Sequence, residues 1–165
     1  DDCMITDIAH DGYGMIVFGK AQTRVGLVSV TKSTLTEMGS LMQLNDGIEK
    51  VVMDQCIVYN NTFATKNYHR IDKQPGAISV TNTIFAGSNN GQKFNATYSN
   101  YSTYFLFTSS YMTSDIIIDR YGFTDITPYS GTSEDLFVDP ANGDFHLKST
   151  AKFPGKETAG DPRWW

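Results

Sequence analysis

Residues 78–85 read Ile-Ser-Val-Thr-Asn-Thr-Ile-Phe, and three other stretches of the chain align with them, namely 28–35, 51–58 and 105–112. A truncated copy, Asp2-Cys3-Met4-Ile5, opens the chain. Each copy carries one small residue, which we call the anchor: Cys3, Ser33, Cys56, Thr83 and Ser110. The anchors are 30, 23, 27 and 27 residues apart. A segment that recurs at such a period is typical of repeat architectures.

The pattern within each copy predicts a strand followed by a bend. Apolar residues stand five and three positions before the anchor and two positions after it, and this alternation places them on one face. The residue just before the anchor breaks the alternation, and we expect a bend there, of the kind that Asn accommodates in the left-handed conformation. These bend residues are Asp2, Lys32, Gln55, Asn82 and Ser109. The intervening positions, which include Thr34, Ile57 and Ile84, are expected to face outward.

One copy has no means of burying its apolar face, whereas copies stacked in register form continuous inward columns. The columns are Val28, Val51, Ile78, Phe105; then Val30, Met53, Val80, Phe107; then Ile5, Leu35, Val58, Phe85, Met112. We expect an all-β fold, a right-handed parallel β-helix (a solenoid) of about five coils, with further strands near 15–18, 41–44 and 116–118. A β-sandwich gives no such column register, and the Leu/Asn framework of leucine-rich repeats is absent.

The coils are expected over residues 1–135. Final short strands and a C-terminal cap are expected over 136–165, because the end of a solenoid exposes strand edge and core. Phe153, Trp164 and Trp165 suit that task. Residues 119–135 are expected to form a loop. Since the chain opens Asp1-Asp2-Cys3, without Met or a basic leader, we expect a processed chain or part of a longer one.

The register also predicts the state of the two cysteines. Cys3 and Cys56 share a column two copies apart, which places their Cα atoms ~9.6 Å apart at the ~4.8 Å strand spacing. A disulfide requires Cα atoms within ~7 Å. We therefore expect two free, buried thiols.

Two stretches near the end of the chain carry a family resemblance. Residues 136–147, Leu-Phe-Val-Asp-Pro-Ala-Asn-Gly-Asp-Phe-His-Leu, resemble the closing motif of secreted right-handed β-helix proteins of the pectate-lyase-like superfamily. Gly160-Asp161-Pro162-Arg163-Trp164 resembles the end of a C-terminal domain of unknown function in gut-bacterial glycan-utilisation proteins. The resemblance implies an exported protein at the cell surface, in the periplasm or outside the cell. It does not imply catalysis.

Composition excludes several classes of protein. The net charge of −5, the pI near 5.0 and the lack of a Lys/Arg cluster disfavour a nucleic-acid partner. No apolar run approaches the ~20 residues of a transmembrane helix. An aromatic content of 13% argues against intrinsic disorder.

The search for chemistry yields weak candidates. Asp54 is the only acid in the outward columns beside the anchor, so no ladder of carboxylates is predicted, and no spaced set of metal ligands is present. A turn containing Lys66, Arg70 and Asp72 offers a base and a carboxylate, although a solvated loop is the simpler interpretation. An Asn- and Ser-rich insertion with Tyr98, Tyr101 and Tyr104 suits sugar stacking, against the alternative of a loop packed on the flank. Together with Asp54, these tyrosines are the predicted carbohydrate-binding residues.

Three functions remain open from the sequence. The first is a non-catalytic, polysaccharide-binding β-helix module. The second is a polysaccharide lyase or glycoside hydrolase whose catalytic coils lie upstream; a lyase would use Ca²⁺ to neutralise the uronate carboxylate. The third is a structural or adhesive solenoid, for which Val52, Ile57, Ile84 and Leu106 provide a weak apolar outer stripe for trimerisation.

Overall fold

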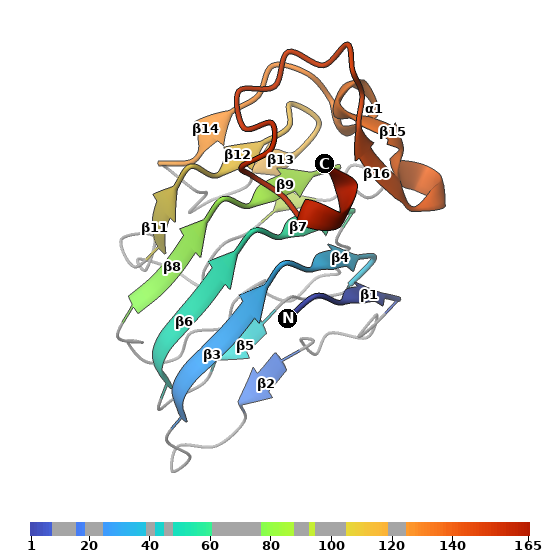
Figure 1. Ribbon diagram of the computed structural model, residues 1–165. Helices are drawn as coiled ribbons and strands as arrows, with labels where there is room; N and C mark the ends of the chain where they lie inside the picture. Colours follow the sequence, from blue (N-terminus) through green and yellow to red (C-terminus); the bar gives the residue numbers. More distant parts are fainter. Residues whose placement is uncertain are drawn as a thin grey trace.

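The computed structural model describes residues 1–7, 16–18, 25–38, 42–44, 48–60, 77–87, 93–94, 105–118 and 125–165. Parallel sheets make up most of its regular structure, and this confirms an all-β chain. Figure 1 shows four strands side by side, in sequence order along one sheet. They are β3 (Val25–Thr31), β6 (Ile48–Asp54), β8 (Ala77–Thr81) and β11 (Phe105–Thr108).

The short strands that begin just after the anchors form a six-stranded parallel sheet together with β14 (Thr127–Pro128). Its other members are β1 (Met4–Thr6), β4 (Thr34–Thr36), β7 (Ile57–Tyr59), β9 (Ile84–Ala86) and β12 (Tyr111–Met112). Two smaller parallel pairs join β2 (Ile16–Phe18) to β5 (Met42–Leu44) and β10 (Lys93–Phe94) to β13 (Ile117–Ile118). Strands β2, β5 and β13 fall within the predicted second-strand segments. Strand β14, by contrast, lies inside the segment 119–135 that was expected to be a loop.

The predicted register is confirmed strand by strand. Val51 pairs with Val28 on one side and Ile78 on the other, and Val58 lies between Leu35 and Phe85 in the same way. The inward side chains of the two large sheets meet in one core, which includes Val30, Leu35, Met53, Val58, Val80 and Phe85. Burial of each such side chain contributes on the order of 1.5–3 kcal/mol.

The predicted bends are confirmed as well. All five residues before the anchors adopt the left-handed conformation, with φ between 47° and 59°. The bends are also hydrogen-bonded from one repeat to the next. The Lys32 N–H donates to the Asp54 carbonyl at 2.9 Å, and the Asn82 N–H donates to the Thr108 carbonyl at 2.9 Å. Each bend is thus fixed both by its own conformation and by its neighbour.

The anchors are small and also able to donate a hydrogen bond. The Ser33 hydroxyl donates to the Thr31 carbonyl at 2.7 Å, and the Thr83 hydroxyl donates to the Thr81 carbonyl at 2.9 Å. Because a buried polar group without a partner is costly, this bond to the carbonyl two residues earlier explains why every anchor is Ser, Thr or Cys.

The terminal segment, residues 133–165, packs against the six-stranded sheet. It contains α1 (Ser133–Leu136), the antiparallel pair β15 (Phe137–Asp139) and β16 (Asp144–Leu147), and the 3-10 turns η3 (Pro140–Asn142) and η4 (Pro162–Trp164). Rather than covering only the end of the stack, it lies along the outer face of the six-stranded sheet (Figure 1). There it forms a second core, which includes Ile57, Ile84, Leu136, Phe137, Phe145, Phe153 and Ala159.

This packing corrects the expectation that Thr34, Ile57 and Ile84 lie on an outer surface, because all three are buried. The sequence placed them correctly opposite the first core, but the terminal segment covers them. It also removes Ile57 and Ile84 from the proposed trimerisation stripe, in which Leu106 remains 59% exposed.

Candidate functional site

The structure places one of the predicted site residues. Lys66, Arg70, Asp72, Tyr98, Tyr101 and Tyr104 lie outside the described residues. Asp54 ends β6 on the outer face of the four-stranded sheet, where its register partners are Thr31 and Thr81. Its carboxylate accepts a hydrogen bond from the Asn82 side-chain amide at 3.1 Å. Asp54 is therefore part of the polar surface that links neighbouring repeats.

The outer face of this sheet is open to solvent. One of its columns is Thr31, Asp54, Thr81 and Thr108, and each of these residues is partly or fully exposed. A second column is Ser29, Val52, Ser79 and Leu106. The two columns present hydroxyl, carboxylate and aliphatic groups at the regular spacing of parallel strands, ~4.8 Å. We call this surface the open sheet face.

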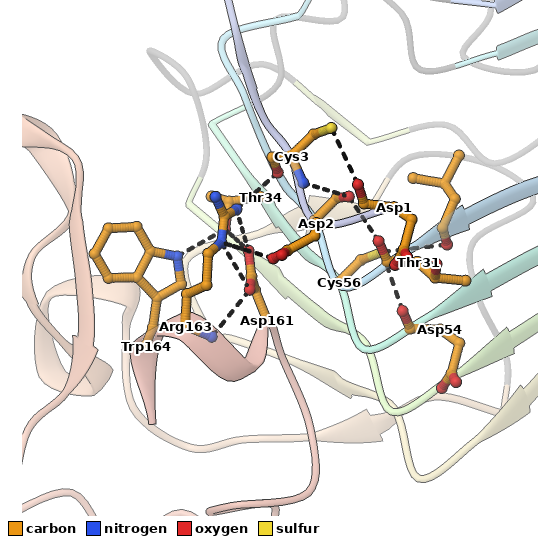
Figure 2. A network of polar contacts seen from close by, with 12 residues as sticks. Asp1, Asp2, Cys3, Thr31, Thr34, Asp54, Cys56, Asp161, Arg163 and Trp164 are labelled. Carbon is orange, nitrogen blue, oxygen red and sulfur yellow. Dashed lines mark hydrogen bonds and ion pairs between the residues drawn. The ribbon is translucent and has the colours of Figure 1, made fainter.

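A polar network joins the terminal segment to the first repeats (Figure 2). The Asp161 carboxylate is fully buried and accepts a hydrogen bond from the Thr34 hydroxyl at 2.7 Å and others from the Arg163 guanidinium. Arg163 also donates to the Cys3 carbonyl at 2.7 Å, and the Trp164 indole N–H donates to the Thr34 hydroxyl at 2.8 Å. The hydrogen bonds and charge of Asp161 raise the pKa of Arg163. This network latches the last residues onto β1 and β4.

The two cysteines differ in their surroundings. Both are free thiols, as predicted, but Cys3 is exposed and only Cys56 is buried. The prediction for Cys3 was wrong because the structure describes no strand on its other side. Burial raises the pKa of the Cys56 thiol to about 12, so Cys56 is a poor nucleophile at neutral pH.

A second row of bends was missed in the sequence. Asp7, Glu37, Asn60 and Gly87 stand four positions after successive anchors, and all have positive φ. The Glu37 N–H donates to the Tyr59 carbonyl at 3.2 Å, and the Asn60 N–H donates to the Ala86 carbonyl at 3.0 Å. Asp, Asn and Gly at three of these four positions were the available signal, because these residues tolerate the left-handed conformation.

A cavity of about 250 Å³ lies between one of these bends, at Glu37, and the terminal segment. The repeats contribute Met4, Thr6, Thr36, Glu37 and Tyr59, and the terminal segment contributes residues 140–143 and Phe145. The Tyr59 and Phe145 rings meet edge to face, with centroids 5.2 Å apart. Two distant parts of the sequence therefore build this cavity together.

Other ionisable groups form local pairs. The His146 ring lies 2.6 Å from the Asp144 carboxylate and packs edge-on against Trp164. Hydrogen bonds from His146 lower the pKa of Asp144. Within the described ranges, the structure brings together no group of three or more His, Cys, Asp or Glu residues able to hold a metal ion. The part of the chain that the structure describes also contains no helix long and apolar enough to cross a bilayer.

Comparison with known families identifies the family of the chain. Residues 29–164 match the family named Domain of unknown function (DUF5123), and the chain belongs to this family. No curated protein and no solved structure matches the chain.

Proposed function

We propose that the chain is a non-catalytic, polysaccharide-binding module of an exported protein, built as a right-handed parallel β-helix. The β-helix is supported by the two large parallel sheets, which each take one strand per repeat in the same order. Bends with positive φ lie at both ends of β1, β4, β7 and β9. Crossovers between parallel strands are right-handed in about 98% of cases, which supports the handedness.

The open sheet face is the observation that carries the proposed binding function. It extends across four repeats, and its Thr and Ser hydroxyls together with Asp54 offer regularly spaced hydrogen-bonding groups. The exposed Leu106 adds an apolar surface for the C–H face of a sugar ring. A polysaccharide is itself a repeating ligand, so a periodic surface allows several weak contacts to act together.

The scarcity of carboxylates on this face also favours binding over hydrolysis. Glycoside hydrolases require two carboxylates that flank the scissile bond. Asp54 is the one acid in the two columns described above, and the Asn82 amide already donates to it. A hydrolase or lyase site would have to be formed elsewhere in the protein.

The experiment is a glycan array probed with the chain, followed by calorimetry on the polysaccharides that bind. The proposal is supported if a polysaccharide binds the chain and binds the Thr81→Arg variant at least about tenfold more weakly. The new side chain covers the centre of the open sheet face. The matched control is Thr127→Arg, at an exposed strand residue of the other sheet. Lack of binding to every acidic and neutral polysaccharide would overturn the proposal, and equal affinities of both variants would move the site away from this face.

A further inference from the structure

We infer that the cavity between the bend at Glu37 and the η3 turn is a separate binding site for one uncharged sugar unit. The inference rests on the proposed function only for the class of ligand, carbohydrate. The site, its size and its charge selectivity are independent of the open sheet face.

The size of the cavity restricts the ligand. Its volume of about 250 Å³ is below the 300–1,000 Å³ typical of pockets for drug-sized ligands. The mouth is accessible, because Thr6, Glu37 and Asn142 are exposed. A single ring at the end or branch of a glycan fits such a space, whereas the interior of a long chain does not.

The lining matches the mixed surface of a sugar. Met4, Pro140 and Phe145 supply apolar atoms, and Thr6 and Thr36 supply hydroxyl groups. Binding sites for small molecules combine an apolar wall with a few polar groups in this way. Thr36 is 5% exposed, so its hydroxyl is held within the structure rather than on a free surface.

The charge of the site selects against acidic sugars. Among the ten residues that line the cavity, Glu37 carries the one carboxylate, and none is Lys, Arg or His. Burial raises the pKa of Tyr59, and four carboxylates raise it further: those of Glu134, Asp115, Glu37 and Asp139. A uronate carboxylate placed here would meet the like charge of Glu37, with no cation in the lining to offset it.

The walls of the cavity are formed before any ligand binds. Glu37 is held in the left-handed conformation, with φ of 52°, by its N–H bond to Tyr59. On the other wall, Gly143 has φ of 85° and donates its N–H to the Pro140 carbonyl at 3.2 Å. A site built in advance avoids the cost of ordering loops during binding.

The experiment is amide NMR of the whole chain titrated with free glucose, galactose, N-acetylglucosamine and galacturonate at millimolar concentration. We expect saturable shifts at the amides of Glu37 and Gly143 with at least one neutral sugar, and none with galacturonate. Absence of shifts with all three neutral sugars, or saturable shifts there with galacturonate, would overturn the inference.

Two variants test the location and the charge. Glu37→Lys should weaken the neutral sugar at least about fivefold and make galacturonate shifts appear. The control is Glu157→Lys, at an exposed glutamate that also has positive φ, 63°, and lies outside the cavity. Ala141→Trp, on the exposed η3 turn, should block the cavity. If Glu37→Lys gains no galacturonate shifts, or neutral-sugar binding persists unchanged in Ala141→Trp, the assignment is wrong.

The outcomes separate this inference from the proposed function. Thr81→Arg should leave the monosaccharide shifts unchanged, and Ala141→Trp should leave binding of long polysaccharides to the open sheet face within about twofold. Array binding without any shifts at the cavity would overturn the inference and keep the proposed function. Shifts at the cavity without array binding would overturn the proposed function and keep the inference.

Discussion

The two large sheets follow the same alternation but have different surroundings. In the four-stranded sheet, one face packs in the core and the other is open, with Leu106 59% exposed. In the six-stranded sheet, the central strands β4, β7 and β9 are buried on both faces, and Ile84, at an outward position, is 1% exposed. The comparison shows that the repeat determines which side chains point away from the first core. Whether those side chains are exposed depends on a distant segment of the chain that can cover them.

The largest effect is expected from a charge introduced at an outward position of the six-stranded sheet, compared with the same change in the four-stranded sheet. Ile84→Asp should unfold the protein, because an unpaired charge in the second core is very costly. Leu106→Asp should change the free energy of unfolding by less than about 0.5 kcal/mol. Urea denaturation of both variants measures the difference, and similar midpoints would show that the terminal segment does not seal the six-stranded sheet.

A smaller effect is expected from the latch that holds the terminal segment in place. Asp161→Ala leaves the Thr34 hydroxyl and the Arg163 backbone N–H without their acceptor. The expected loss of stability is about 1–3 kcal/mol, the usual cost of buried groups without partners. Native-state hydrogen exchange should show the loss first in residues 133–165. The control is Asp144→Ala, whose partner His146 is exposed, and an equal loss in that variant would contradict the importance of the latch.

A pH effect is expected at the bend shared by both sheets. The pKa of the Cys56 thiol is about 12 in the folded chain, against a reference of 9.0. The folded state therefore keeps its proton at pH values where the unfolded state loses it. This contribution to stability is intact below pH 9 and decreases as the pH rises toward 12, with a loss on the order of 1 kcal/mol by pH 10. The measurement is the urea midpoint at pH 8 and pH 10 in wild type and Cys56→Ser. An equally steep decline in the variant would rule out Cys56 as the source.

The smallest effect is expected on the open sheet face. Asp54→Asn replaces an exposed carboxylate by an isosteric amide, so the free energy of unfolding should change by less than about 0.5 kcal/mol. The measurement is again urea denaturation, alongside the affinity for any polysaccharide that the array identifies. A large loss of stability would show that the bond from Asn82 supports the bend, and that this face is structural rather than functional.

Much of the first core could be predicted from the sequence because its causes are local and repeated. Val51, Met53 and Val58 follow period-two alternation, and the five bend residues recur at one position relative to the anchor. The register of the three columns then follows, because each strand pairs with its equivalent in the next repeat.

The features that could not be predicted depend on parts of the structure outside the repeated pattern. Burial of Ile84 depends on residues such as Phe153, which lie about 70 positions later in the chain and share no pattern with the repeats. The cavity at Glu37 needs the η3 turn as its second wall, so its lining could not be found within one repeat. The exposure of Cys3 was missed because the column argument assumes a neighbour on each side.

The paired rows of bends have a consequence for how such a chain can change in length. From the bend residue before the anchor to the bend residue four positions after it, the backbone geometry is held by hydrogen bonds to adjacent repeats. The anchor spacings nevertheless range from 23 to 30 residues. Insertions and deletions are thus accommodated outside this short unit. The segments between successive units can differ in length without changing how the units stack.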